Sequence, residues 1–259
     1  MSLSDIHELP ALILVGGLGT RLKSVVRDRP KPMALVAGLP FLEWLVLMLR
    51  SQGFSRIIFC TGHKAEMIRN YFGDGSRHGV RLRYSHETSP LGTGGAVRLA
   101  LEMERARNFI VLNGDSFLRS DFNELASYHL HKKASSTMFL VSMQDRGRYG
   151  AVEVDDLGAV QSFSEKIPGS RAGLINAGVY CFDRRVFTAL PLHRPCSLEK
   201  EILPGLIGKG LHALVSDGQF IDIGTPQSYA GVPNFFKDED LFLARPAAGI
   251  VAQSPQKGK

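Results

Sequence analysis

Residues 12–22 read Leu12-Ile13-Leu14-Val15-Gly16-Gly17-Leu18-Gly19-Thr20-Arg21-Leu22, and Lys31-Pro32-Met33 follows. The apolar run at 11–15 shows no polar alternation, which predicts a buried parallel strand. The glycines after it let the backbone pass close to a ligand and turn successive N–H groups toward it. Arg21 and Lys31 add cations suited to phosphate. The stretch therefore predicts a site for the phosphates of a nucleotide.

Two better-known phosphate motifs do not fit these residues. A dinucleotide fingerprint needs a third glycine where Leu22 stands, and the P-loop sequence Gly-Lys-Ser/Thr is absent. A plain glycine-rich turn with a solvated arginine is the simpler alternative. The full pattern, with the Lys31-Pro32 pair, resembles the signature of the sugar-phosphate nucleotidyltransferases, which usually has alanine in place of Val15.

Composition predicts one ordinary globular domain. The chain has 259 residues, 44% hydrophobic and 22% charged, and a formal charge of +6. The basic residues are dispersed, which argues against a nucleic-acid partner. We expect a single nucleotidyltransferase domain at 1–243, with a nucleotide half at about 10–135, a sugar half at about 136–236 and a loose tail at 244–259. Cys60, Cys181 and Cys196 suggest neither a disulfide framework nor a zinc site.

The sequence also favours a cytoplasmic protein. The N-terminus lacks the charged and apolar regions of a signal peptide. No uninterrupted apolar run reaches the length that spans a membrane, so no membrane partner is expected. The sequence is compatible with a homodimer but does not fix the oligomeric state.

Strands and helices alternate in the first half. Strands are predicted at Arg56–Cys60, Val80–Tyr84 and Phe109–Leu112, and helices at Phe41–Arg50, Ala65–Tyr71 and Ala96–Glu104. This order predicts an α/β fold, a Rossmann-like three-layer sandwich with a mostly parallel central sheet. Ligands of such sheets collect at the carboxyl ends of the strands. Trp44 is expected in the core.

The second half changes character. Strands are predicted at Ser136–Met143, Ala151–Val154, Val160–Phe163 and Ile175–Phe182, and helices at Ser197–Ile207 and Thr225–Phe236. With little helix between them, these strands are expected to extend the sheet and to build a smaller mixed-strand lid that binds the sugar. The nearby pair His129 and His131 is expected on a helix surface.

Two aspartates are candidates for a metal site. Asp115, in Asn113-Gly114-Asp115-Ser116, follows a predicted strand, and Asp222 comes from the other half of the chain. Two carboxylates with phosphate oxygens and water form a normal ligand set for Mg²⁺. The alternatives are that Asp115 caps a turn and Asp222 caps the next helix. The resemblance implies that these aspartates hold the catalytic Mg²⁺ and that Asn113 and Gly114 contact the nucleotide.

A second glycine-rich stretch, Pro90-Leu91-Gly92-Thr93-Gly94-Gly95-Ala96, opens a predicted helix. The resemblance implies that Gly92 and Thr93 contact the base or ribose, whereas Thr93 could instead be a helix N-cap. Glu87 lies just before this stretch. A carboxylate accepts hydrogen bonds and can meet the adjacent N1–H and amino group of guanine. The alternative is that Glu87 is a solvated loop residue.

The sugar site is expected around Phe163-Ser164-Glu165-Lys166. Lys166 can neutralise a sugar 1-phosphate, Glu165 and Asn176 can bind hydroxyls, and Gly150 leaves room for the ring. An adjacent Glu-Lys pair is otherwise usually a solvated surface feature. The flanking Arg148-Tyr149-Gly150 and Asn176-Ala177-Gly178 stretches, at family-like spacing, favour the site.

The resemblance extends from about Pro10 to Phe236 and is strongest to family members that transfer GMP from GTP to D-glycero-α-D-manno-heptose 1-phosphate for bacterial surface polysaccharides. Members that use mannose 1-phosphate resemble the chain next. The resemblance implies catalytic roles for Arg21, Lys31 and Lys166. Nucleotide contacts are implied for Leu14, Gly16, Gly17, Gly19 and Thr20.

Two other classes of function remain open from the sequence. A glycosyltransferase that uses a nucleotide-sugar donor usually carries Asp-x-Asp, whereas Asp115 is followed by Ser116 and Phe117. A non-catalytic sensor of sugar nucleotides would be expected to lose Arg21, Lys31 or an aspartate, and all are present.

Overall fold

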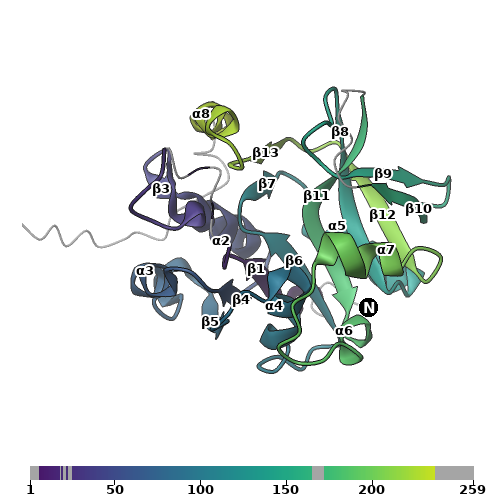
Figure 1. Cartoon of the computed structure of the whole chain (residues 1–259), viewed down its shortest axis with the longest axis horizontal. Coiled ribbons are helices and arrows are strands. Elements are labelled where there is room, and N and C mark those ends of the chain that lie inside the picture. The colour runs from purple at the N-terminus through teal and green to yellow at the C-terminus, as the bar shows by residue number, and fades with distance from the viewer. Residues whose placement is uncertain (1–5, 18, 20–21, 23–24, 165–171, 237–259) are drawn as a thin grey trace, which may run out of the picture.

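The structure is a computed structural model of the whole chain, and it describes residues 6–17, 19, 22, 25–164 and 172–236 (Figure 1). Within these ranges no helix has the length and apolar character that crossing a membrane requires. The strands are β1 (Ala11–Leu14), β2 (Leu35–Val36), β3 (Leu39–Pro40), β4 (Arg56–Thr61), β5 (Arg81–His86), β6 (Asn108–Asn113), β7 (Ser116–Leu118), β8 (Ser136–Met143), β9 (Ala151–Val154), β10 (Val160–Ser164), β11 (Gly173–Asp183), β12 (Leu211–Ser216) and β13 (Phe220–Asp222).

The helical elements include two short 3-10 turns and one π-helix. They are η2 (Lys31–Met33), α2 (Phe41–Ser51), α3 (Ala65–Phe72), η3 (Ser76–His78), α4 (Gly92–Ala100), α5 (Phe122–Lys132), α6 (Arg185–Thr188), the π-helix η4 (Leu198–Ile202), α7 (Leu203–Gly205) and α8 (Pro226–Phe235).

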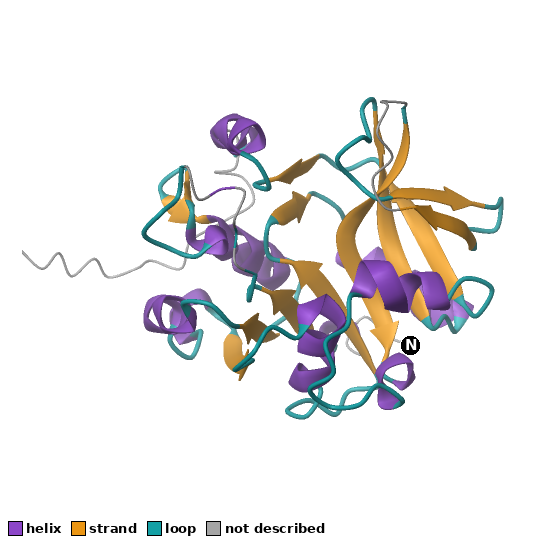
Figure 2. Ribbon diagram, viewed as in Figure 1, coloured by secondary structure: helices purple, strands orange, loops and turns teal. Residues whose placement is uncertain are grey.

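The centre of the fold is a parallel sheet, as the sequence predicts. In the described residues, a nine-stranded sheet has the order β10-β9-β11-β6-β1-β4-β5, with β8 joined to β11 and β12 joined to β8. Strands β5, β4, β1 and β6 run parallel, and Ile13 of β1 pairs with Phe59 on one side and Leu112 on the other. The mixed strands of the second half continue this sheet, as Figure 2 shows.

Alternate side chains of the central strands enter two separate cores. Ile13 packs in one core with residues of α2, α3 and α5, while its neighbour Leu12 packs in the other with residues of α4, α6 and α7. Both side chains are 0% exposed, and burying each contributes about 1.5–3 kcal/mol. Helices on both faces of the sheet give the three predicted layers. Trp44 lies in the first core, as expected.

Strand β11 joins the two halves of the chain. On one side it pairs antiparallel with β8 along both its earlier and its later part, and on the other its later part pairs with β6 and its earlier part with β9. The register shifts between Asn176 and Tyr180, where Gly178 has φ +73°. A Cβ at Gly178 would lie 2.6 Å from Asn113 Nδ2, so glycine is required for both its conformation and its close approach.

Several predicted elements differ in detail. The predicted helix at 197–207 is a π-helix followed by the short α7, and α4 begins at Gly92, four residues earlier than expected. The sequence pattern did not predict the strands β2, β3, β7, β12 and β13 or the short helix α6. The expectation for the histidine pair is half wrong: His131 is exposed on α5, but His129 is 1% exposed and contacts Thr137 and Asn108.

Candidate active site

A large cavity of about 770 Å³ lies at the carboxyl ends of β1, β4, β5 and β6. Because these strands are parallel, their ends bring the loops that follow them to one edge of the sheet. The predicted residues that line this large cavity are Leu14, Gly16, Gly17, Gly19, Lys31, Glu87, Gly92, Thr93, Asn113, Gly114 and Asp115.

A lateral cavity of about 290 Å³ adjoins it on the side of β9, β10, β11 and β13. Among the predicted sugar and metal residues, Gly150, Asn176, Asp115 and Asp222 line this lateral cavity. Four residues line both cavities: Lys31, Asn113, Asp115 and Glu199. Predicted residues Thr20, Arg21, Glu165 and Lys166 lie outside the described residues.

The glycine loop approaches its neighbours closely. A Cβ at Gly16 would lie 2.9 Å from Glu87 Oε1, and one at Gly114 would lie 2.6 Å from the Leu14 carbonyl oxygen. Gly19 has φ +59°, and a Cβ there would lie 2.9 Å from the Lys31 side chain. The loop therefore needs glycines to pack against β6 and against Lys31 while its backbone faces the large cavity.

The Glu87 side chain forms part of the cavity wall between the two glycine-rich stretches. Its Oε2 accepts a hydrogen bond from the Leu91 N–H at 3.1 Å, just before α4. Burial raises the pKa of Glu87, and the Leu91 N–H opposes this rise. Lone pairs remain on both carboxylate oxygens, so the side chain can accept further hydrogen bonds from a ligand.

Thr93 does not cap its helix. The N-cap of α4 is Leu91, without a side-chain bond. Instead, Thr93 Oγ1 donates to Glu199 Oε2 at 2.9 Å and accepts from the Leu198 N–H at 2.8 Å. The same segment also bonds α4 through its backbone, since the N–H of Gly94 donates to the Cys196 carbonyl at 2.8 Å. Thr93 thus connects the large cavity with the segment that carries Glu199.

Glu199 is a candidate site residue that the sequence analysis missed. It lies on the π-helix η4, in the wall between the large and the lateral cavity. No motif marks Glu199, because only the packing of residues 196–199 against α4 brings it to the site.

Lys31 and Asp115 form an ion pair at this same wall. Lys31 Nζ donates to Asp115 Oδ2 at 2.6 Å, and the lysine side chain is 12% exposed against 43% for the aspartate. No turn N–H within the described residues bonds the Asp115 carboxylate, which leaves the turn-cap alternative without support. The pair joins the Lys31 turn to the end of β6.

Asp222 is held by a second cation. Arg148 Nη2 donates to its Oδ2 at 2.6 Å, and the Tyr149 hydroxyl donates to the same oxygen. Burial, and then the Asp222 carboxylate, raise the pKa of Tyr149 to about 12. The cap alternative for Asp222 is wrong, because Thr225 is the N-cap of α8.

Asp115 and Asp222 are brought together by the pairing of β7 with β13. Asp222 lies opposite Ser116, and the Ile223 N–H donates to the Asp115 carbonyl at 2.9 Å. Both side chains line the lateral cavity and both are balanced by cations. Carboxylate oxygens are the hard ligands that Mg²⁺ takes, so the chemistry of these two side chains suits a divalent cation, although Asp222 Oδ1 already accepts hydrogen bonds from the Gly224 N–H at 2.6 Å and the Ser228 hydroxyl at 3.1 Å.

Asn176 also lines the lateral cavity and is held by two hydrogen bonds. Its Nδ2 donates to the Tyr180 hydroxyl at 2.7 Å, and its Oδ1 accepts from the Gly178 N–H at 3.0 Å. Tyr180 is 0% exposed, and burial raises its pKa. These bonds determine the orientation of the amide, so Asn176 offers a ligand a preset donor and acceptor.

Known proteins that are similar to this chain include two enzymes and one crystal structure. The D-glycero-α-D-manno-heptose 1-phosphate guanylyltransferase of Aneurinibacillus thermoaerophilus is 40% identical over 85% of this chain and 95% of its own length. The mannose-1-phosphate guanylyltransferase of Mycobacterium tuberculosis is 35% identical over 86% of this chain and 63% of its own length. The crystal structure of HddC from Yersinia pseudotuberculosis, complexed with GMP-PN, matches with a TM-score of 0.78 and 35% identity, and covers 88% of this chain and 100% of that one.

The family comparison agrees with the α/β fold. The profile of the nucleotidyl transferase family matches residues 10–239, nearly the whole described part of the chain. The chain belongs to the nucleotidyl transferase family.

Proposed function

We propose that this chain transfers GMP from GTP to D-glycero-α-D-manno-heptose 1-phosphate, giving GDP-heptose and pyrophosphate. The observation that carries this proposal is the wall of Lys31, Asn113, Asp115 and Glu199, which lines both cavities. A nucleotide in the large cavity and a sugar phosphate in the lateral cavity would meet at this wall. The similar protein of A. thermoaerophilus, named for this reaction, supports the choice of sugar.

The reaction needs no proton transfer. An oxygen of the sugar 1-phosphate attacks the α-phosphorus of GTP, and the bond to the bridging oxygen of the β-phosphate breaks, so that pyrophosphate leaves with the electron pair. The nucleophile is already an anion. The protein therefore has to position two anions and neutralise their charge. Lys31 is suited to this task because its ammonium group lies in the shared wall.

The two halves of the domain would divide the substrates. In the nucleotide half, 10–135, the glycine loop would hold the phosphates, Gly92 and Thr93 the base or ribose, and Glu87 the guanine edge. In the sugar half, 136–236, Gly150 and Asn176 would face the sugar. Arg21, Glu165 and Lys166 keep the roles predicted from the sequence: Arg21 and Lys166 would neutralise phosphate charge, and Glu165 would bind sugar hydroxyls.

We also propose Mg²⁺ as the cofactor. Asp115 and Asp222 would hold it, and when bound it would supply charge for the phosphate oxygens. Cytoplasmic location, a role in capsule or lipopolysaccharide synthesis and a homodimeric state remain predictions.

The test is a pyrophosphate-release assay of the four nucleoside triphosphates against a panel of hexose and heptose 1-phosphates, with and without Mg²⁺. The proposal expects the highest kcat/KM for GTP with the heptose 1-phosphate. A higher kcat/KM with mannose 1-phosphate would instead assign the chain to that sugar. If none of the sugar 1-phosphates in the panel leads to release of pyrophosphate, the proposal is contradicted.

A further inference from the structure

A third cavity, also of about 290 Å³, lies beside the large cavity and is strongly basic. Its polar side chains come from Arg27, Arg29, Lys31, His63 and Lys64. Of the residues that the structure describes, no aspartate or glutamate lines it. We call it the basic cavity. It shares Gly19, Lys31 and His63 with the large cavity, so the two are adjacent.

Only part of this positive charge is balanced. Arg29 is paired with Asp28, whose carboxylate lies 2.7 Å away and whose side chain is 67% exposed, and Lys31 is paired with Asp115. Lys64 Nζ donates at 3.2 Å to the uncharged backbone carbonyl oxygen of Arg27, and its charge acts on the same Asp28 carboxylate that Arg29 already pairs. Within the described ranges, the Arg27 guanidinium has no carboxylate partner. The basic cavity therefore has a surplus of positive charge.

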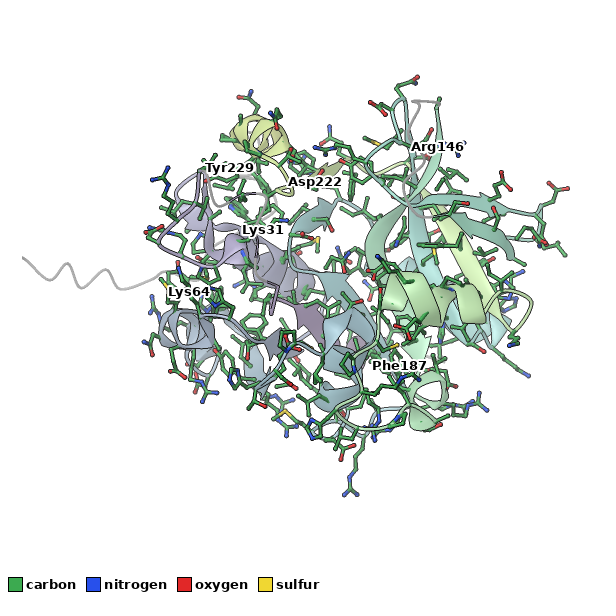
Figure 3. The ribbon with its side chains drawn as sticks, in the orientation of Figure 1. Lys31, Lys64, Arg146, Phe187, Asp222 and Tyr229 are labelled. Atoms are coloured by element: carbon green, nitrogen blue, oxygen red, sulfur yellow. The ribbon has the colours of Figure 1, made fainter. Side chains whose placement is uncertain are left out.

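The backbone also holds Lys64 in an unusual conformation. Its φ is +56°, in the left-handed region that residues other than glycine rarely adopt. Such conformations are found disproportionately at functional sites. Figure 3 shows Lys31 between Lys64 and Asp222, which agrees with Lys31 lining the basic, the large and the lateral cavity.

We propose that the basic cavity is a second anion site, which receives inorganic pyrophosphate as it leaves the large cavity. This inference rests on the proposed function, in which pyrophosphate is the leaving group. Pyrophosphate has several negative charges and many acceptor oxygens, and guanidinium and ammonium groups are its natural donors. Lys31 and His63 border both cavities, so the anion can pass between them without losing all its donors. No bond forms or breaks in this transfer.

The test uses the full chain loaded with guanosine 5′-(β,γ-imido)triphosphate, which occupies the triphosphate positions of the large cavity. Inorganic pyrophosphate is then titrated into the loaded protein by calorimetry. We expect one equivalent to bind, and Arg27→Gln and Lys64→Gln each to weaken this binding about tenfold, as the loss of one charge-assisted hydrogen bond does. Arg77→Gln, at an exposed arginine of η3 outside the basic cavity, is the matched control and should bind as the wild type does.

Two results would overturn the inference. One is that the loaded wild-type protein binds no pyrophosphate, and the other is that Arg27→Gln and Lys64→Gln bind it as tightly as Arg77→Gln. Calorimetry needs no turnover, so the result is independent of the pyrophosphate-release assay. Normal GMP transfer without binding to the loaded protein would contradict this inference alone, whereas binding without GMP transfer would contradict the proposed function alone. Thermal melting of each variant checks that it is folded.

Discussion

Lys31 Nζ lies 2.6 Å from Asp115 Oδ2, although 84 residues separate the two in the sequence. The same ammonium group is 3.8 Å from the point that a Cβ on Gly224 would occupy, which is itself 2.6 Å from Asp222 Oδ1. One cation therefore lies close to both candidate metal ligands. Lys31 offsets the charge of Asp115 directly, while Arg148 and Tyr149 bind the Asp222 carboxylate.

Asp115→Asn should remove most turnover without unfolding the protein. The change removes a charge at the wall between the cavities, and losing one such group typically costs about 3–4 kcal/mol in the transition state, or roughly two to three decades in kcat. Pyrophosphate release measures the rate, and thermal melting measures the fold. Asp217→Asn, at an exposed aspartate away from the cavities, is the control. A kcat near that of the wild type for Asp115→Asn would contradict the assignment of Asp115 to the active site.

Glu87→Gln should change the choice of base. The amide oxygen can still accept from the Leu91 N–H, but the amide group replaces one acceptor by a donor. A charge-assisted bond contributes about 1.5–3 kcal/mol, so kcat/KM for GTP should fall about ten- to a hundred-fold while that for ATP hardly changes. Glu66→Gln, at an exposed glutamate of α3, should leave both values unchanged. If Glu87→Gln keeps its full preference for GTP, another group reads the base.

Thr93→Val should weaken binding of the sugar 1-phosphate, although Thr93 itself lines the large cavity. Valine has nearly the same shape but breaks both bonds of Thr93, to Glu199 and to Leu198. Loss of the bond to the carboxylate should lower the free energy of unfolding by about 1–3 kcal/mol. Because Glu199 also lines the lateral cavity, the KM for the sugar 1-phosphate should rise severalfold. Thr188→Val removes a single exposed hydroxyl bond and should alter neither quantity. An unchanged KM would show that Thr93 is only structural.

His129 should make the protein less stable as the pH falls. Burial lowers the pKa of His129 from 6.5 to about 4, so the folded state keeps the ring neutral while the unfolded state gains a proton. The free energy of unfolding is therefore unaffected by His129 above pH 6.5, and it falls by about 3 kcal/mol as the pH is lowered from 6.5 to 4. His129→Gln should flatten this part of the pH profile, measured by denaturant unfolding. His131→Gln, on the same helix but exposed, should retain the wild-type profile, and equal slopes for all three proteins would contradict the assignment.

The central sheet and the large cavity could be predicted because their signals are local. The apolar run of β1 and the glycines after it lie within a dozen residues, and the parallel sheet places the ends of β4, β5 and β6 beside them. Strand β12 escaped prediction because its sequence mixes polar and apolar residues without a clean period. In α5 even a histidine is buried, through contacts with Thr137 and Asn108 that no local pattern reveals.

The electrostatics of the site could not be predicted in the same way. The sequence suggested Lys31, Asp115 and Asp222 separately, but nothing in it pairs Lys31 with Asp115 or Asp222 with Arg148. The Lys31–Asp115 pair arises because the segments that follow β1 and β6 meet at one edge of the sheet, and the Asp222–Arg148 pair arises because the end of β13 meets the loop before β9. Glu199 illustrates the same limit, since its position depends on how residues 196–199 pack against α4.

The change of partners along β11 sets the boundaries for any chimera that exchanges the sugar specificity of this protein. A junction inside β11 would separate Val179, paired with Leu112 of β6, from Ile175, paired with Ala151 of β9. It would also fall beside Gly178, which no other residue can replace without striking Asn113. A transplanted segment should therefore begin before β8 and end after β11, so that donor and recipient meet in loops and not within the shared strand.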